Sequence, residues 1–157
     1  MSTDDTLLET LLAALRVCKL DAVVIRNTAA ILHGVPVTTL DADLLVRDSK
    51  VTDRKLLDVA TRLGAVVTSP FEPLSSVRRL QGFELPIDVM LPPSGRFRFE
   101  ALMSRAESIP VGREMARVAS LADVIEMKRA ADRPKDRAVL PILEAALQVQ
   151  RARRATP

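Results

Sequence analysis

The stretch VVIRNTAAILHGVPVTTLDADLLV, residues 23–46, contains the pattern that decides the fold. Val23–Ile25 is a short apolar run typical of a buried strand, Thr28–Leu32 predicts a short helix, and Gly34–Pro36 stops that helix. Leu40–Val46 predicts a second strand that carries two aspartates. We expect the rest of the chain to form the scaffold that holds these two strands.

Asp41 and Asp43 stand at alternate positions of the second predicted strand, so both side chains should point to one face, about 6.6 Å apart along the strand. Two aligned carboxylates repel each other unless a cation lies between them, and oxygen-only ligands suit a hard ion such as Mg²⁺. A strand edge with two solvated acids would have the same pattern. The pair alone therefore leaves a metal site and a solvated edge open.

The order of the motifs around these aspartates is similar to that of the nucleotidyltransferase superfamily, in particular its small bacterial members related to abortive-infection and toxin nucleotidyltransferases. The resemblance covers about residues 20–140, nearly the whole chain. The matching positions are Ile25, Arg26-Asn27, Thr28–Gly34, Thr38-Thr39, Asp41–Leu44, Ile87–Val89, Ser120–Ala130 and Arg133–Asp136.

The resemblance implies an α/β (α+β) fold, a mixed twisted sheet flanked by helices. It also implies Mg²⁺-dependent transfer of a nucleoside monophosphate from an NTP to a hydroxyl acceptor, with two metal ions about 3.5–4 Å apart. Asp41 and Asp43 would bind the ions that contact the nucleotide phosphates. Asp88 would complete the second-metal site and help to deprotonate the acceptor hydroxyl.

The turn at Arg26-Asn27 departs from the Gly-Gly or Gly-Ser of the superfamily. Small residues at a helix start let backbone N–H groups approach phosphates, and glycine adopts backbone angles that arginine avoids. Asn27 could cap the helix. Arg26 could bind a phosphate, pair with Asp41 or Asp43, or simply be exposed, and the sequence leaves these three possibilities open.

The resemblance adds further candidates for the nucleotide site. Lys128 matches a lysine that approaches the nucleotide, and Arg133 is a second nucleotide-binding candidate in the same region. The alternative is a solvated basic face, since Arg129, Lys135 and Arg137 are close by. Thr38 and Thr39 could hydrogen-bond a phosphate or support the turn. Asp136 could tie down Arg133 or Lys128. The only histidine, His33, is expected to be a capping or supporting group.

Composition sets limits on the class of protein. The 157 residues are 48% hydrophobic and 27% charged, which suits one globular domain over residues 1–150 followed by a basic tail, 151–157. Four phenylalanines without tryptophan or tyrosine argue against a binder that stacks single-stranded bases. A net charge of +3 permits a polyanionic partner. Four arginines could form a basic rim for RNA: Arg78, Arg79, Arg96 and Arg98.

The chain lacks a run of about 18 apolar residues and begins with an acidic, polar stretch, so we expect a cytoplasmic protein that does not enter the membrane. Cys18 is the only cysteine, which excludes an internal disulfide. The oligomeric state is left open.

The other predicted elements follow from periodicity and from turn residues. A leucine stripe predicts a first helix capped by Ser2 or Thr3, and Ser120 with Asp123 predicts a capped helix that ends at Pro134. The last helix should be interrupted or restarted at Pro141, with a frayed tail at 151–154. The remaining elements are a helix at 51–63 ended by Gly64, strands at 65–68, 75–80 and 85–90, a helix at 97–105, and a hairpin at 108–111 and 115–118.

Two functional hypotheses of different classes follow. The first is a nucleotidyltransferase whose acceptor is RNA, a protein side chain or a small molecule. The second is a catalytically weakened domain that binds a nucleotide or a partner protein, as in a toxin–antitoxin-like module. The retained aspartates favour the first, and the missing glycine turn favours the second. A purely structural protein with incidental acids is the third alternative.

Overall fold

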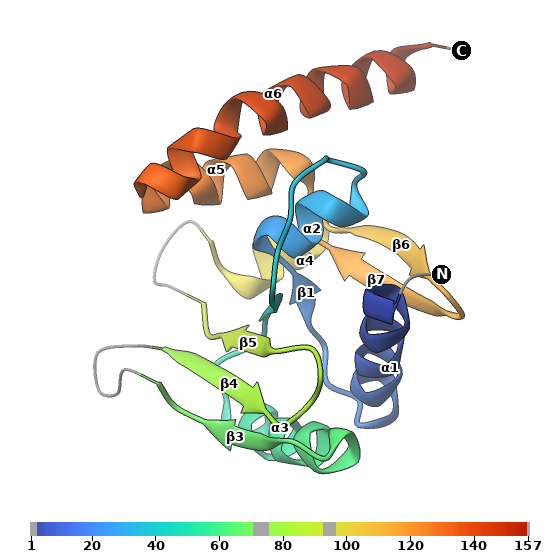
Figure 1. Cartoon of the computed structure of the whole chain (residues 1–157), viewed down its shortest axis with the longest axis vertical. Coiled ribbons are helices and arrows are strands. Elements are labelled where there is room, and N and C mark those ends of the chain that lie inside the picture. The colour runs from blue at the N-terminus through green and yellow to red at the C-terminus, as the bar shows by residue number, and fades with distance from the viewer. Residues whose placement is uncertain (1–2, 71–75, 93–96, 157) are drawn as a thin grey trace.

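A mixed seven-stranded sheet organises the computed structural model, which describes residues 3–70, 76–92 and 97–156 (Figure 1). The strand order is β3-β4-β5-β2-β1-β7-β6. The helices are α1 Thr3–Val17, α2 Arg26–Leu32, α3 Lys50–Leu63, α4 Phe99–Arg105, α5 Leu121–Ala131 and α6 Pro134–Ala155. The strands are β1 Val23–Val24, β2 Ala42–Leu45, β3 Val66–Thr68, β4 Val77–Gln81, β5 Ile87–Met90, β6 Glu107–Val111 and β7 Glu114–Val118.

The centre of the sheet explains why the apolar runs of the sequence are short and continuous. Strand β2 runs parallel to β5 and antiparallel to β1, and β1 in turn runs parallel to β7. All four residues of β2 are buried, and so are both residues of β1. Strands covered on both faces carry such runs instead of an alternating pattern. The predicted α/β fold with a mixed sheet is confirmed.

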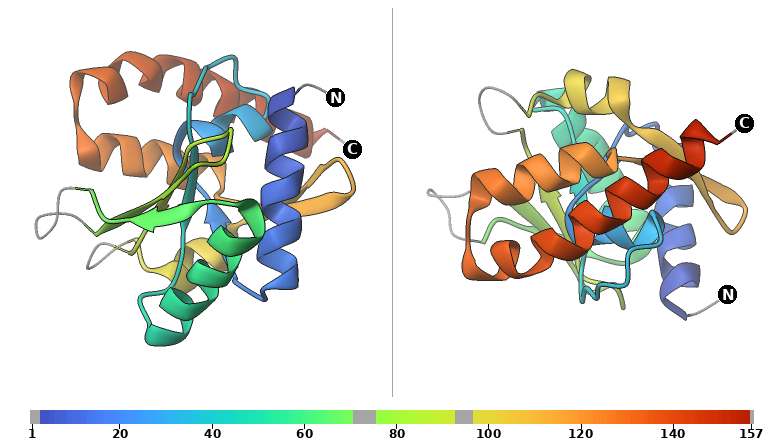
Figure 2. Two further views of the ribbon diagram at one scale, coloured as in Figure 1. Left: turned by 60° about the horizontal axis from the view of Figure 1, so that its bottom comes forward. Right: turned by 90° about the horizontal axis from the view of Figure 1, so that it is seen from above.

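The helices gather at different ends of the sheet (Figures 1 and 2). Helix α5 packs against both α2 and α6, and these three helices lie together at one end. Helix α3 packs against β3 at the opposite end, and α1 contacts α3 and β7. The loop after β1, the segment before β2 and the end of α5 therefore meet beneath α6.

Local signals account for most element boundaries. The α1 stripe buries Leu8, Leu11, Leu12 and Leu15. Helix α3 begins after Ser49, whose hydroxyl accepts the Thr52 N–H, and it ends at Gly64 in the left-handed conformation, with φ of 67°. Ser120 likewise accepts the Asp123 N–H at the start of α5. The end of α3 at Gly64, the Ser120 cap and the β6–β7 hairpin agree with the predictions, whereas the Ser49 cap was not predicted.

The structure corrects four boundaries. Helix α2 begins at Arg26 instead of Thr28, and β2 begins at Ala42, so Asp41 precedes the strand. Helix α5 ends at Ala131, before Pro134. Helix α6 continues through Pro141 to Ala155, so the predicted interruption and the frayed tail at 151–154 are wrong. A proline inside a helix removes one backbone hydrogen bond, and packing against α5, with Leu143 fully buried, compensates for that loss.

Three predictions fall outside the described residues: the Ser2 cap, the start of the strand at Ser75, and the rim residue Arg96. Within the described part of the chain, none of the helices has the length and apolar character that a membrane crossing requires.

Candidate functional site

Strands β2 and β5 place two aspartates side by side. Asp43 and Asp88 occupy the same register position of the parallel pair, so both side chains leave the same face of the sheet. Asp41 lies two residues before Asp43, at the mouth of the same face. A cleft of about 900 Å³ opens over these carboxylates, between the sheet and α6.

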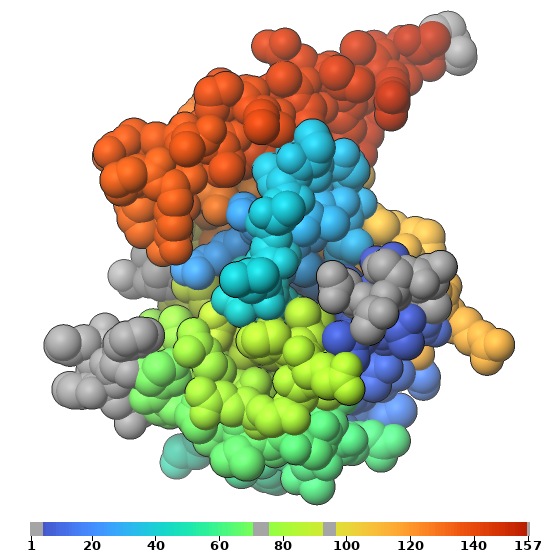
Figure 3. All heavy atoms as spheres, viewed as in Figure 1, coloured from blue at the N-terminus to red at the C-terminus, as the bar shows by residue number. Residues whose placement is uncertain are grey.

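All nine sequence-predicted site residues line this cleft. They come from the α2 turn, the segment before β2, the strands β2 and β5, helix α5 and the start of α6. In the space-filling view, α6 (orange to red) lies against the segment that follows α2 (cyan) (Figure 3). The nine residues are Arg26, Asn27, Thr38, Thr39, Asp41, Asp43, Asp88, Lys128 and Arg133.

Burial makes Asp43 a difficult place for a negative charge. The residue is only 7% exposed. Burial raises the pKa of Asp43 to about 6, and the neighbouring carboxylates of Asp88 and Asp41 add to the rise, whereas Arg26 and Lys128 lower it. A cation bound beside Asp43 would oppose both burial and the two neighbouring carboxylates, and would favour the ionised form of this side chain.

Thr28 fixes the backbone of both β2 aspartates, and the sequence analysis did not single it out. Its buried hydroxyl donates to the Asp41 carbonyl oxygen at 3.1 Å and accepts the Asp43 N–H at 3.2 Å. The α2 helix is thereby tied to the strand that carries the acids. The position of Thr28 directly after the Arg26-Asn27 turn was a usable signal, because it places a hydroxyl at the start of the helix that precedes the two acids.

Asp88 is held by an arginine on the neighbouring strand. Arg79 on β4 stands directly across from Asp88, and its guanidinium donates to both carboxylate oxygens, with Nε at 2.7 Å from Oδ1 and Nη2 at 3.4 Å from Oδ2. This pairing corrects the prediction that Arg79 belongs to an exposed RNA-binding rim. Arg78 and Arg98 do not line the cleft.

The acids have the right chemistry for Mg²⁺, but their present arrangement is incomplete. Oxygen-only donors from Asp41, Asp43 and Asp88 suit a hard cation, and burial together with Asp88 and Asp41 raises the pKa of Asp43. Across residues 3–70, 76–92 and 97–156, however, no three acidic, histidine or cysteine side chains are gathered as a metal ion requires. One reason is that Arg79 occupies the oxygens of Asp88.

A cationic wall faces the acids from α5 and α6. Asp136, which is fully buried, accepts hydrogen bonds from Arg133 Nε at 2.6 Å and from the Arg133 backbone N–H at 3.1 Å, and it lies 3.5 Å from Lys128 Nζ. Burial alone would raise the pKa of Asp136, but the hydrogen bonds from Arg133 outweigh burial and lower it. The predicted tie between Asp136 and both cations is present in the structure.

Lys128 is a buried cation with cationic neighbours. Burial lowers its pKa, Asp136 opposes that effect, and the charges of Arg26 and Arg133 lower the pKa further. The single carboxylate of Asp136 thus serves two cations while Arg26 adds a third positive charge nearby. Such a wall favours an anionic ligand, and the solvated basic face considered for Lys128 does not describe this buried side chain.

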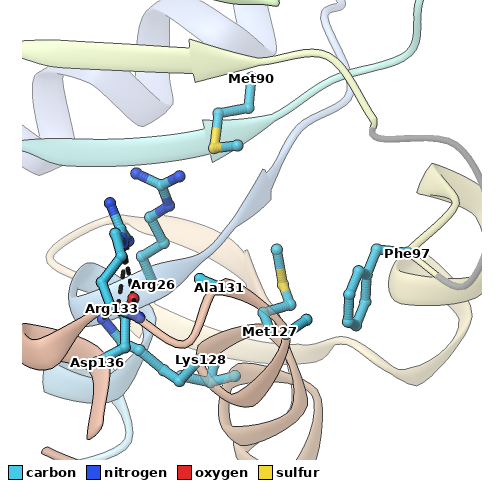
Figure 4. A pocket seen from close by; sticks show the side chains of 10 residues that line it. Arg26, Met90, Phe97, Met127, Lys128, Ala131, Arg133 and Asp136 are labelled. Carbon is cyan, nitrogen blue, oxygen red and sulfur yellow. Dashed lines mark hydrogen bonds and ion pairs between the residues drawn. The ribbon is translucent and has the colours of Figure 1, made fainter.

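The α2 turn keeps a glycine-like backbone although it carries arginine. Arg26 has φ of 57°, in the left-handed backbone region that residues other than glycine rarely adopt. Its side chain lines the cleft, and none of the ion pairs between described residues joins it to Asp41 or Asp43. Figure 4 shows its guanidinium beside that of Arg133, directed toward Met90. The geometry disfavours the pairing alternative and leaves Arg26 available for a ligand.

The polar residues around the turn have mainly local partners. Ile25 is the N-cap of α2, so Asn27 does not take the capping position that the sequence left possible for it. Asn27 Nδ2 donates to the Thr38 carbonyl at 3.2 Å, while Asn27 Oδ1 is buried and has no partner among the described residues. The Thr39 hydroxyl donates to the Asp41 carbonyl at 2.9 Å. Thr39 therefore supports the turn, and Asn27 Oδ1 is an acceptor that a bound donor could satisfy.

His33 lies away from the cleft and joins three elements. Its buried ring donates from Nε2 to the Ala119 carbonyl at 2.8 Å, and Nδ1 lies 3.2 Å from Nε2 of Gln150 on α6. The residue is also the C-cap of α2. The prediction of a supporting role agrees with these contacts.

Several other cleft residues were not predicted. Arg79 could have been found, because a hairpin between residues 77–81 and 87–90 brings it opposite Asp88. The α6 residues had no signal, because their role depends on how that helix folds back over the sheet. These further residues are Pro36, Val37, Val77, Arg79, Met90, Lys135, Val139 and Ile142.

Comparisons with known proteins agree with the fold. No protein-family model and no curated protein matches the sequence. Among solved structures, ANT(2'')-Ia in complex with adenylyl-2''-tobramycin is 16% identical, with a TM-score of 0.64 over 98% of this chain and 100% of that chain. A solution structure of the antibiotic-resistance factor ANT(2'')-Ia is 17% identical, with a TM-score of 0.65 over 98% and 94%. A Thermotoga maritima protein assigned as a nucleotidyltransferase is 16% identical, with a TM-score of 0.63 over 90% and 93%.

The chain therefore has the nucleotidyltransferase fold, as the motif order predicted. The likeness extends over nearly the whole length of each chain, so the cleft lies within the shared part of the fold. At these identities the likeness shows the fold alone, and the chemistry must be argued from the cleft.

Proposed function

We propose that the protein transfers a nucleoside monophosphate from an NTP to a hydroxyl acceptor in a Mg²⁺-dependent reaction. One observation carries the proposal: on a nucleotidyltransferase fold, a single cleft has three aspartates on the sheet side and a cationic wall from α5 and α6 opposite. A metal-chelated polyphosphate matches this distribution of charge, because it needs acids on one side and cations on the other.

Three cations would bind the polyphosphate. Arg26 presents a guanidinium without a carboxylate partner among the described residues, and Lys128 with Arg133 is held in place by Asp136. Charge-assisted hydrogen bonds from these groups would orient the triphosphate. Burial lowers the pKa of Lys128 and the charges of Arg26 and Arg133 lower it further, so an incoming anion would favour the charged form of this lysine.

Asp41, Asp43 and Asp88 would hold Mg²⁺, which when bound neutralises phosphate charge and stabilises the leaving pyrophosphate. The acceptor oxygen forms a bond to the α-phosphorus while the bond from that phosphorus to the bridging oxygen of the β-phosphate breaks. The proton of the acceptor hydroxyl passes to the Asp88 carboxylate. This role requires Asp88 to be released from Arg79.

The acceptor carries a hydroxyl group. The transfer assay tests three classes of acceptor: RNA, a protein side chain and a small molecule. One neighbour was solved with an adenylylated aminoglycoside, which makes polyhydroxylated small molecules a reasonable first set for this chain. In the assay, labelled NTP is incubated with each class, and transfer of label to any one of them supports the proposal. Hydrolysis without transfer, or no turnover, contradicts it.

The ion pair between Arg79 and Asp88 favours a second function, a catalytically weakened domain that binds a nucleotide or a partner protein. Calorimetric titration of ATP, GTP, CTP and UTP with Mg²⁺ tests the partner-binding form of this alternative, and the transfer assay tests the nucleotide-binding form. An enzyme should bind at least one of them more weakly when EDTA replaces Mg²⁺. Absence of nucleotide binding would favour the partner-binding alternative, including a toxin–antitoxin-like module.

Arg79→Gln should strengthen Mn²⁺ binding about tenfold, because a guanidinium that competes for both oxygens of Asp88 is removed. Mn²⁺ affinity can be measured by electron paramagnetic resonance of the free ion. Arg78→Gln, on the same strand and with the same loss of charge, is the matched control and should leave the affinity unchanged. Equal affinity in both variants and the wild type would show that Arg79 does not limit metal binding.

Arg26→Gly and Arg26→Ala should both weaken ATP binding by about tenfold or more, because each removes a guanidinium that can bind phosphate. The two variants should differ in stability. Glycine accepts a φ of 57° and alanine does not, so Arg26→Gly should be about 1 kcal/mol more stable than Arg26→Ala. Isothermal calorimetry and denaturant unfolding measure the two effects. Tighter ATP binding in either variant would instead mean that Arg26 blocks the site.

A further inference from the structure

A second cavity of about 420 Å³ adjoins the cleft (Figure 4). The two cavities share Arg26, Met90, Lys128 and Arg133, so one ligand can extend from the cleft into the second cavity. The shared cations stand at the junction, beside the carboxylate of Asp136. Nothing in the proposed transfer chemistry uses the space beyond this junction.

The far part of the cavity is apolar. Its walls are the thioether of Met127, the ring of Phe97, the buried side chain of Val124 and the methyl group of Ala131, and the thioether of Met90 adds an apolar side chain at the junction. In Figure 4, Met127 lies between Phe97 and Ala131, while the guanidinium groups of Arg26 and Arg133 are at the other end. The cavity is thus cationic at its entrance and apolar in its interior.

We propose that this cavity holds the nucleobase of the NTP, with the phosphates on the cations at the junction. The inference rests on the proposed function. A ligand that fits must carry negative charge at one end and a flat apolar group at the other, and a nucleotide combines both. A volume of about 420 Å³ is within the range of small-molecule sites, and methionine side chains adapt to planar rings.

The walls also set the substrate class. None of the five apolar side chains can hydrogen-bond to a base edge, and strong discrimination between bases requires such bonds. Recognition by contact area alone favours purines over pyrimidines and treats adenine and guanine alike. We therefore expect ATP and GTP to bind within about fivefold of each other and more tightly than CTP and UTP.

The acceptor is the competing occupant of this cavity. A hydroxyl-rich small molecule is less well suited, because it carries polar groups on all sides, whereas a nucleobase can lay its apolar faces against these side chains. A small molecule without phosphates also leaves the junction cations without an anionic partner. A nucleotide uses the charged and the apolar parts of the cavity together.

Ala131→Phe tests the inference because it fills the cavity from an exposed position at the last residue of α5, where the fold should tolerate a larger side chain. Calorimetry with Mg²⁺ compares ATP with inorganic tripolyphosphate, which has no base. We expect ATP affinity to fall at least tenfold and tripolyphosphate affinity to change less than twofold. Ala138→Phe, an exposed α6 position that lines neither cavity, is the matched control and should bind both ligands like the wild type.

Unchanged ATP affinity in Ala131→Phe would overturn the inference, as would a preference above a hundredfold for one base. If Ala131→Phe loses both ligands, Met127→Ala decides: weaker ATP binding with unchanged tripolyphosphate binding supports the base site, and unchanged ATP binding rejects it. A wild type that binds tripolyphosphate as tightly as ATP rejects the base site but keeps the phosphate site. A wild type that binds neither rejects the proposed function itself.

Discussion

Asp43→Asn is expected to abolish nucleotidyl transfer, by at least a thousandfold, and at the same time to make the protein more stable at neutral pH. The loss of transfer follows because Asp43 is the buried carboxylate at the centre of the acid group. The gain in stability follows because the folded protein holds this charge in a place where burial and two carboxylates oppose it. A structural acid would behave in the opposite way.

The raised pKa of Asp43 predicts how the stability difference between the wild type and Asp43→Asn changes with pH. In the folded protein the pKa of Asp43 is raised from 3.8 to about 6. The folded state therefore binds this proton more tightly than the unfolded chain does. The stability that the protonated Asp43 carboxyl contributes is complete below about pH 4 and is lost as the pH rises to about 6. Each pH unit is worth about 1.4 kcal/mol. We expect the wild type to lose about 2–3 kcal/mol of unfolding free energy over this range relative to Asp43→Asn.

Urea unfolding of the wild type and Asp43→Asn at several pH values between about 4 and 8, without metal, measures this difference. Asp58→Asn, an exposed position on α3 far from the cleft, is the control and should show no such pH-dependent difference. A large stability loss in Asp43→Asn at neutral pH would show that the acid is structural. Retained transfer activity would remove Asp43 from the proposed metal site.

Asp136→Asn should cost about 3–5 kcal/mol of stability, the largest single effect that we expect. Asp136 is fully buried and is the carboxylate partner of both Arg133 and Lys128. Removing one member of a buried ion pair leaves the other charge uncompensated, here Lys128 beside the charges of Arg26 and Arg133. The capping interaction at the start of α6 would keep only an uncharged acceptor for the Arg133 backbone N–H.

The matched control is Asp132→Asn, four residues earlier, where an exposed carboxylate pairs with Arg137 at 3.1 Å. An exposed pair contributes little, so its loss should cost less than about 1 kcal/mol. Denaturant midpoints of both variants at pH 7 give the comparison. Equal costs in the two variants would mean that Asp136 does not anchor the cationic wall.

The sequence predicted that the aspartates lie on buried strands, because the alternation of side chains along a strand depends only on neighbouring residues. Alternation in the second strand put Asp41 and Asp43 on one face, and the apolar residues on both sides of Asp88 indicated another buried strand. What the sequence could not provide was the parallel pairing that sets Asp88 beside Asp43, since the two residues meet only when distant segments fold together. The pairing of Arg79 with Asp88 depends on the same register.

The turn at Arg26 and helix α6 show two different reasons why the sequence did not predict the whole site. The position of Arg26 in the motif predicted a backbone that arginine avoids, and its φ of 57° has that character. The direction of its side chain was left open, because the contacts of a long side chain depend on residues that only the tertiary fold brings near. For α6, the local penalty of Pro141 predicted an interruption, but tertiary packing against α5 outweighed that penalty.

The position of β1 has a consequence for how the molecule assembles. This two-residue strand lies between β2, the next strand along the chain, and β7, a strand about 90 residues later in which Val118 pairs with Val24. The turn that carries Arg26 is therefore fixed on one side by a segment near the other end of the chain. Pairings between distant segments slow folding, since a long loop must close first. During synthesis the cleft should form last, and a fragment that stops before β7 should leave an open sheet edge instead of a smaller working site.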